Sequence, residues 1–416
     1  MESEILKNLD NPNFLERLYR ENKSSFKKDF NEIYESIKGN NVADVWNERL
    51  NYDNDKIAWG SQKEIIFVVI SSIFAGIITK IPDIFPFISK ETFFYKNISF
   101  AIFPFLIFYF TSLKQRGFKK YFVPLVLLIV PILYINILPE NNIYTGTLSL
   151  VCIFMPILMY FILDLTFSDF DFFDYKKRIE FLKFSGDLVV ISAIIFIAGA
   201  ILTFISFALF KFIYPEFIEF YLKNIVVWGL VSIPIVGTYI VRTNPQIVNK
   251  VSPLIAKLFT PLVLITLFFY LISIVVIGKS PYQDREFLLV FNFLLIGVMA
   301  LILFSTLENS KQRGSKSGVV LLILLSLLTI VCNGVALSAI VFRISEWGIS
   351  PNRLTVFVSN ILMLVNLVFI FVSLIRAYRN FDFMINVEKS IAYFFPVYLL
   401  WVLVVIFVFP LVFGVV

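Results

Sequence analysis

The chain contains no histidine and only two cysteines. Without histidine there is no Ser-His-Asp or Cys-His catalytic set, no histidine general base, and no His-ligated zinc or haem site. Cys152 and Cys332 each lie inside an apolar run, so we expect both to act as small hydrophobic residues rather than as a disulfide. No GxxxxGK[ST] loop or GxGxxG fingerprint occurs, so nucleotide-driven work within this chain is not expected. No cofactor and no catalytic residue is predicted.

Charged residues are also scarce. They make up 16% of the 416 residues, whereas hydrophobic residues make up 58%, and the mean hydropathy is +0.84. Soluble domains carry about 25% charged residues, so a chain this long and this poor in charge cannot cover an aqueous core. We therefore expect the lipid bilayer to be its solvent. The net charge of +6 then reflects basic residues gathered in cytoplasmic loops, and no nucleic-acid partner is predicted.

Long runs without Asp, Glu, Lys or Arg follow a polar beginning. Crossing about 30 Å of hydrocarbon takes roughly 20 helical residues, and lone strands cannot satisfy their backbone there. We predict an all-α polytopic bundle of about 11 spans (roughly 10 to 12) in residues 64–416. The runs are 65–79, 97–113, 121–139, 141–163, 188–210, 224–241, 258–278, 287–307, 317–342, 354–375 and 390–416.

The distribution of basic residues predicts the orientation of the bundle. With the amino-terminus in the cytoplasm and eleven spans, 27 of the 36 basic residues fall in cytoplasmic segments and 9 outside. This agrees with the positive-inside rule and places the carboxy-terminus outside. Abundant Lys, Asn, Ile and Phe indicate an AT-rich bacterial genome, so the cytoplasmic (inner) membrane of a bacterium is expected. The polar first 63 residues predict no signal peptide, and the run from Ile65 can serve as a signal-anchor.

Residues 1–63 are predicted to form a small helical cytoplasmic segment. Asn11 precedes the first expected helix, Ser24 or Ser25 caps the second, and Gly39 breaks it before a third. The segment is either a cap on its own bundle or a docking module for a protein partner. The expected apolar faces are Phe14, Leu15, Leu18 and Tyr19, then Phe26, Phe30, Ile33 and Ile37, then Val42, Val45, Trp46 and Leu50.

Polar groups inside the predicted spans are few. The spans contain no charged residue, which disfavours proton relays and ion-coupled carriers. Asn333 and Asn360 are candidate ligand groups, although Asn in a span more often joins helices. Prolines within the runs either kink helices or break them, and a broken helix exposes backbone groups to a substrate. These prolines are Pro131, Pro156, Pro234, Pro261 and Pro396.

Two loops concentrate polar side chains. In the predicted cytoplasmic loop, Asp169, Asp171 and Asp174 alternate with Phe, which indicates either a divalent-cation site or an interfacial helix. Whether any metal binds stays open. In the predicted external loop, Arg343 and Glu346 have the spacing of a helical ion pair. The alternatives there are a tight hairpin and a site for an anionic headgroup or solute that uses Arg343 and Arg353.

The external loop also carries a resemblance. Its sequence Arg-Ile-Ser-Glu-Trp-Gly-Ile-Ser-Pro-Asn-Arg, residues 343–353, resembles the signature R-I-S-E-Y-G-[LI]-T-x-N-R of a family of bacterial multispanning membrane proteins. That family is catalogued as domain of unknown function 4153. Trp347 and Ser350 replace the usual Tyr and Thr. The resemblance implies an inner-membrane protein and carries no activity.

Three functions remain open. The leading hypothesis is a permease-like or lipid-handling protein for a neutral or amphiphilic molecule, which predicts a polar midplane cavity lined by Asn333 or Asn360. The second is a non-catalytic scaffold or sensor that acts through residues 1–63. The third, and least favoured, is an enzyme that uses surface carboxylates such as Asp169 or Asp171.

Overall fold

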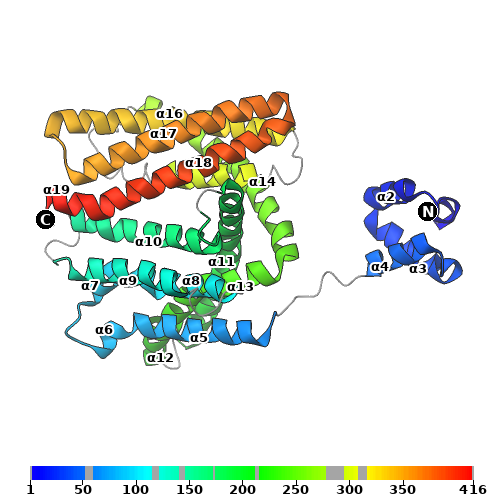
Figure 1. The fold of residues 1–416 in the computed structure, drawn as a ribbon, viewed down its shortest axis with the longest axis horizontal. Coiled ribbons are helices and arrows are strands. Elements are labelled where there is room, and N and C mark those ends of the chain that lie inside the picture. Colours follow the sequence, from blue (N-terminus) through cyan, green and yellow to red (C-terminus); the bar gives the residue numbers. More distant parts are fainter. Residues whose placement is uncertain are drawn as a thin grey trace. The chain divides into compact units, whose positions relative to one another are not determined.

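The computed structural model is helical throughout the part of the chain that it describes (Figure 1), which confirms the predicted all-α fold. Its residues fall into two compact units, Met1–Ala58 and Trp59–Val416, each with buried hydrophobic residues of its own. The described residues are 2–51, 60–114, 121–139, 146–171, 174–210, 215–277, 295–307 and 316–414.

The described residues of the first unit form four short helices rather than three. Asn11 caps the second as predicted, and Asn22 caps the third in place of Ser24 or Ser25, because its side-chain oxygen accepts the Ser25 N–H at 3.1 Å. Gly39, with φ +92°, separates the last two helices, as predicted. The helices are α1 (Glu2–Lys7), α2 (Pro12–Glu21), α3 (Lys23–Ile37) and α4 (Asn41–Asn51).

An aromatic core holds these four helices together. Phe26 and Phe30 are fully buried, and the Phe26 ring lies 5.1 Å from that of Trp46. The predicted face of α4 is wrong at one position, since Val45 is 66% exposed and Ala43 is buried. Positions 43, 46 and 50 follow the helical period, and position 45 lies off that face. The unit thus has a hydrophobic core of its own.

The second unit is a bundle of apolar helices and short breaks. Eight helical segments of the described residues are long and apolar enough to cross a membrane: α5, α7–η1–α8, α10, α11, α12–η3–α13, α16, α17 and η4–α18–η5–α19. Their bounds, with those of the other elements, are α5 (Gln62–Thr79), α6 (Ile81–Ile84), α7 (Lys90–Asn97), η1 (Ile98–Ala101), α8 (Phe103–Ser112), α9 (Phe122–Ile137), α10 (Gly146–Phe167), α11 (Tyr175–Phe210), α12 (Pro215–Phe220), η3 (Tyr221–Val226), α13 (Val227–Thr243), α14 (Pro245–Ile277), α16 (Lys316–Trp347), α17 (Pro351–Arg379), η4 (Phe381–Phe383), α18 (Met384–Leu403), η5 (Val404–Val408) and α19 (Phe409–Phe413).

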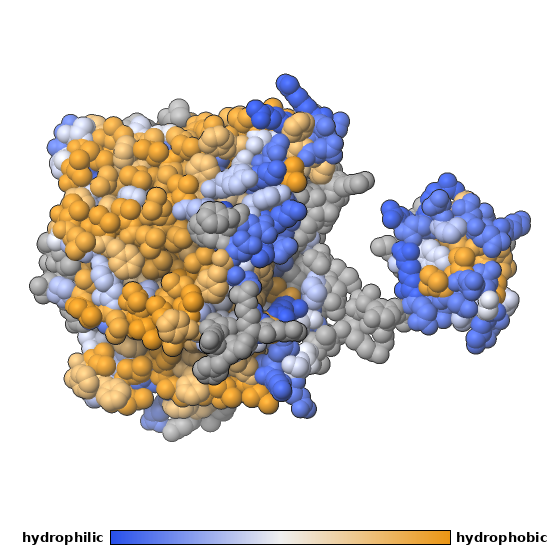
Figure 2. Space-filling model, viewed as in Figure 1, coloured by the Kyte–Doolittle hydropathy of each residue, from blue (hydrophilic) through white to orange (hydrophobic). Residues whose placement is uncertain are grey.

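The other three predicted spans coincide with shorter apolar helices. These are α9, the stretch Lys257–Phe269 within α14, and the helix Leu295–Leu307. The count of about eleven spans therefore stays a prediction. The face of this unit seen in Figure 2 is broadly apolar, with hydrophilic residues gathered toward the end where α5 begins. Such a surface is compatible with an integral membrane protein.

Two hydrophobic clusters fill the bundle. One is centred on α8, α10 and α13, and the other on α16, α17 and the helix Leu295–Leu307. Helices α11 and α18 contribute to both: Phe181 and Phe395 belong to the first cluster, and Ile179 and Val387 to the second. In Figure 1, α10, α17 and α18 run side by side, whereas α11 crosses their direction. Helices α11 and α18 therefore join the two halves of the bundle, each half being the helices around one hydrophobic cluster.

Polar contacts join loops at each end of the bundle. At one end, Lys114 pairs with Asp169 at 2.9 Å, and Lys183 pairs with Glu388 at 3.4 Å. At the other end, Lys80 donates to the Lys223 carbonyl at 2.7 Å, Lys96 to Leu138 at 2.9 Å, and Thr147 to Gly414 at 2.5 Å. Each contact joins two segments that the count of basic residues assigns to the same side.

Candidate functional site

One of the candidate spans is broken in its first half. Helix α7 ends at Asn97, four residues of 3₁₀-helix come next, and α8 begins at Phe103. Pro104 explains the change of geometry, because it has no N–H to donate and its ring would clash with the Phe100 carbonyl in a continuous α-helix. Ser99 lies within the break, 4% exposed, and its hydroxyl has no hydrogen-bond partner among the described residues.

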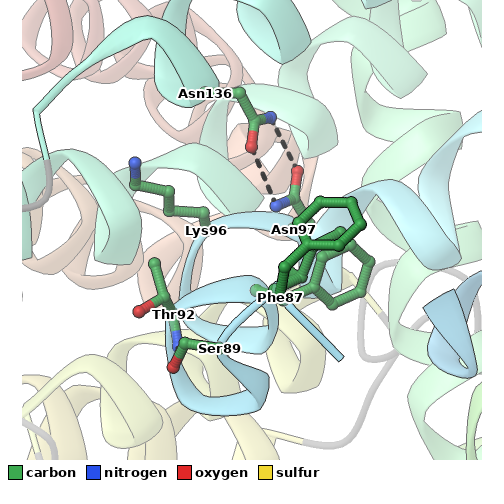
Figure 3. A pocket seen from close by; sticks show the side chains of 8 residues that line it. Phe87, Ser89, Thr92, Lys96, Asn97 and Asn136 are labelled. Carbon is green, nitrogen blue, oxygen red and sulfur yellow. Dashed lines mark hydrogen bonds between the residues drawn. The ribbon is translucent and has the colours of Figure 1, made fainter. Parts of the chain in front are cut away.

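A pocket of about 410 Å³ lies beside α7 at the end where the chain enters this broken span (Figure 3). The loop before α7, α7 itself and α9 form its walls. Among the described residues, no aspartate, glutamate or arginine lines it. Its lining residues are Phe87, Ile88, Ser89, Thr92, Phe93, Lys96, Asn97 and Asn136.

Two asparagines form the polar floor of this pocket. Asn97 donates to the Asn136 side-chain oxygen at 3.1 Å, and Asn136 donates back to Asn97 at 2.8 Å (Figure 3). Asn136 also donates to the Ile132 carbonyl at 2.9 Å. The reciprocal pair ties α7 to α9 and holds both amides in fixed orientations. Ser89 caps α7, with its hydroxyl oxygen accepting the Thr92 N–H at 3.5 Å.

Lys96 is the one charged residue among the described residues of the lining, and it is only 3% exposed. Its ammonium donates to the Leu138 carbonyl, near the end of α9. In Figure 3 this ammonium extends away from the asparagine pair. Lys96 therefore helps to join α7 to the chain after α9.

A second pocket, of about 500 Å³, lies on the opposite face of α7. It is mostly apolar, and α10 forms its other wall. Beside it the hydroxyls of Tyr95 and Ser149 are joined by a hydrogen bond of 2.7 Å. The lining residues are Glu91, Phe94, Tyr95, Ile98, Cys152 and Ile153.

The two asparagines proposed from the sequence lie elsewhere. Asn333 on α16 is fully buried, and neither its amide nitrogen nor its oxygen has a hydrogen-bond partner among the described residues. Asn360 on α17 is 1% exposed. Neither residue lines the two pockets beside α7, and a ligand-binding role for them stays a prediction.

The predicted external loop forms the tight turn between α16 and α17. Gly348, with φ +73°, ends α16, and Ser350 caps α17. The Arg353 guanidinium donates to the carbonyls of Trp347 and Gly348 at 2.6 and 2.7 Å. Arg343 lies over the Trp347 ring, 5.9 Å from its centroid, and its predicted pair with Glu346 stays a prediction.

The three aspartates of the predicted cytoplasmic loop lie near the junction of α10 and α11. Asp169 pairs with Lys114, and Asp171 pairs with Lys177 at 3.1 Å. The Asp174 carboxylate accepts the Lys176 N–H at 2.9 Å. Among the described residues, which leave out 172 and 173, these carboxylates do not gather into a possible metal cluster.

Helix α11 begins at Tyr175, before its predicted span 188–210. Its first turns contain charged residues, one of which is buried in the bundle. Arg178 is 4% exposed and donates to the Ala392 carbonyl at 2.8 Å. Asp164, near the end of α10, is 2% exposed and accepts the Ser168 hydroxyl. Both charges lie outside the predicted charge-free runs 141–163 and 188–210, in the parts of α10 and α11 that extend past those runs. Charge-free runs mark the hydrocarbon-length core of a helix and not its buried ends.

The comparisons with known proteins add no relative. No family model, no curated protein and no solved structure matches this chain. A function for it therefore has to be argued from the membrane-compatible helical fold and from the pockets beside α7.

Proposed function

We propose that this protein is permease-like or lipid-handling and binds an amphiphilic molecule beside α7. The observation that carries the proposal is that one short helix has a polar pocket on one face and an apolar pocket on the other. Thr92, Phe93 and Lys96 line the polar pocket, whereas Phe94 and Ile98 line the apolar one. An amphiphile has both a polar and an apolar part to place.

The broken span supports this site. Discontinuous helices in transporters expose polar groups where a substrate binds, and here the break between α7 and α8 comes directly after Asn97. The loop before α7 exposes Phe85 and Phe87, by 46% and 84%. Aromatic residues are common at the membrane–water interface, so the polar pocket suits a headgroup at that depth.

We also propose the membrane arrangement that the sequence predicts: about eleven spans in a bacterial cytoplasmic membrane, with the amino-terminus in the cytoplasm and the carboxy-terminus outside. The ion pairs and hydrogen bonds that join same-side segments support this alternation. Membership of the family with domain of unknown function 4153 rests on residues 343–353. On this arrangement the pocket beside α7 opens toward the outside.

Native mass spectrometry of the full chain, gently extracted from its own membrane, tests the proposed function. We expect a stoichiometric lipid or small amphiphile on the protein. Thr92→Trp, which fills the polar pocket, is expected to displace it. Val331→Trp, at a 47% exposed position on α16, is the control of matched size and is expected to retain it. A wild-type protein without such a ligand contradicts the proposal, as does a ligand that Thr92→Trp leaves in place.

The second candidate function is a scaffold or sensor that acts through the amino-terminal helices. Its supporting observation is that Met1–Ala58 forms a compact unit with its own buried core. Deletion of residues 1–58 retains Ser61 and Glu64, which form a capping box at the start of α5. Under this hypothesis the deletion abolishes capture of a protein partner and leaves the thermal stability of the bundle unchanged. Retained capture excludes it.

A further inference from the structure

We propose that the polar pocket beside α7 selects an uncharged, hydroxyl-bearing headgroup, that of a glycolipid, over an anionic headgroup. This inference rests on the proposed function, since it names the class of amphiphile that the pocket takes. It is carried by the hydrogen-bonding capacity of the lining and by the placement of the nearby charges.

The polar side chains of the pocket offer donors and acceptors together. After the reciprocal pairing, Asn97 retains one amide hydrogen, and the side-chain oxygens of Asn97 and Asn136 each retain a lone pair. Ser89 and Thr92 each add a hydroxyl, which donates and accepts. Sugar hydroxyls also donate and accept, so they match this mixed set. An ionised phosphate or carboxylate group only accepts hydrogen bonds. Its oxygens would be repelled by the side-chain oxygens of the asparagines, which are also acceptors.

The positive charges of this segment are directed elsewhere. Lys96 donates to the Leu138 carbonyl and extends away from the asparagine pair (Figure 3). Lys80 and Lys90 both pair with Asp83 in the turn before α7, at 3.2 and 2.5 Å. An anionic headgroup in the pocket would therefore lack the charge-assisted bonds that usually compensate its loss of water.

The aromatic rings in the lining of the polar pocket also suit a sugar ring. Phe87 and Phe93 lie beside the polar groups, and Phe87 is 84% exposed. Small-molecule sites commonly combine aromatic walls with a few placed polar groups. A sugar ring has C–H surface for such walls and hydroxyls for the asparagines. The apolar pocket on the other face of α7 leaves room nearby for hydrocarbon chains.

Lipid competition on the full chain tests this inference. The protein is placed in phosphatidylcholine nanodiscs that contain equal minor amounts of monoglucosyl diacylglycerol and phosphatidylglycerol with the same acyl chains. Native mass spectrometry then measures the ratio of the two lipids that stay bound. We expect the glucolipid to be retained about tenfold over phosphatidylglycerol, the preference given by one or two additional hydrogen bonds.

Three variants separate the pocket from the rest of the surface. Thr92→Val removes one hydroxyl with little change of shape, and the double variant Asn97→Leu with Asn136→Leu removes the amide pair. Both are expected to reduce the ratio toward one, and Thr92→Val suffices if the double variant does not fold. Asn224→Leu is the control, since Asn224 lies in η3, at the same end of the bundle, and does not line the pocket.

The outcomes distinguish this inference from the proposed function. Preferential retention of phosphatidylglycerol that depends on Asn97 and Asn136 overturns the uncharged headgroup and leaves an amphiphile site at α7. An equal ratio in the wild type and every variant, with both lipids still lost from Thr92→Trp, does the same. Retention that no pocket variant changes, Thr92→Trp included, overturns the inference together with the proposed function.

Discussion

Single charged residues near the helix ends connect helices and loops through ion pairs and hydrogen bonds. The Lys80 ammonium binds Asp83 and also the Lys223 carbonyl, so it joins the end of α5 to η3. Lys114 bridges in a similar way to the Asp169 carboxylate and the Thr166 carbonyl. A lysine whose stem lies along apolar surface with its ammonium at the helix end is favourable in a membrane protein. The charges at these ends therefore have a structural role.

The ion pairs of Asp83 with Lys80 and Lys90 are sensitive to acid. The ammonium groups of Lys90 and, next, Lys80 hold the pKa of its carboxyl below the ordinary value of 3.8. Because the folded pKa is lowered, the stabilisation is present above pH 4 or so and is lost as the pH falls through the folded pKa. We expect the difference in melting temperature between the wild type and Asp83→Asn to become smaller as the pH falls below 3.8. Parallel melting curves of the two proteins against pH check this, and a difference that stays constant as the pH falls further contradicts it.

Arg353 makes a second tie, across the turn between α16 and α17. Arg353→Ala leaves the terminal carbonyls of Trp347 and Gly348 without this donor. We expect a loss of about 1 kcal/mol in the free energy of unfolding, the usual net value of such bonds. Arg379→Ala, at the exposed end of α17, is the control and is expected to have little effect. Unfolding in detergent measures both, and equal stability of the two variants would show that the capping is dispensable.

At the scale of elements, a proline within a helix of this protein does not by itself end that helix. Pro131, Pro156, Pro234, Pro261 and Pro396 all lie inside helices that continue past them. Two of the irregular segments precede other prolines: the 3₁₀ break η1 precedes Pro104 and the π-helix η5 precedes Pro410. A proline ring clashes with the carbonyl four residues earlier, which for Pro410 belongs to Ile406. A wider π turn accommodates that carbonyl.

Tyr134 donates a hydrogen bond to the Ile406 carbonyl in η5. Its hydroxyl donates to Ile406 at 2.9 Å, and it comes from α9. Tyr134→Phe is expected to lower the free energy of unfolding by about 1–2 kcal/mol, because a carbonyl in an apolar interior loses its donor. Tyr393→Phe, at a 59% exposed position, is the control. Thermal unfolding of both variants in detergent checks the difference, and identical melting temperatures would exclude a stabilising role for this bond.

At the scale of the whole molecule, the bundle consists of two packed halves joined by α11 and α18. Most charge lies at the ends, yet Arg178 and Asp164 are buried where α10, α11 and α18 meet. Buried charges are costly to maintain in a membrane protein and are commonly paired or functional. The junction of the halves is therefore more polar than the predicted spans implied.

The orientation and the odd number of spans are checked by thiol labelling of intact cells. Single cysteines are introduced at Leu6, Ile349 and Val412, all exposed, in a background of Cys152→Ala and Cys332→Ala. A membrane-impermeant reagent is expected to label positions 349 and 412 from outside and position 6 only after permeabilisation. Labelling of positions 6 and 412 from the same side would exclude eleven spans.

Signals carried by neighbours in sequence predicted local structure well. The helix start at Asn11 and the break at Gly39 are each formed with residues a few positions away. The pocket beside α7 was not predicted, since Asn97 and Asn136 are 39 residues apart on different helices. Hydropathy assigns both to membrane segments and does not say which segments are neighbours. Pro104, which follows the polar residues Asn97 and Ser99, was the one available sign of a break.

The sequence by itself determined that this protein is helical, that lipid is its expected solvent and that chemistry requiring histidine is excluded. These properties follow from composition and from runs of apolar residues, which report on the free energy of each segment separately. Only the tertiary structure decided which helices meet, because lateral packing depends on shape and on a few long-range hydrogen bonds. It thereby placed Asn97 against Asn136 and buried Arg178 beside α18.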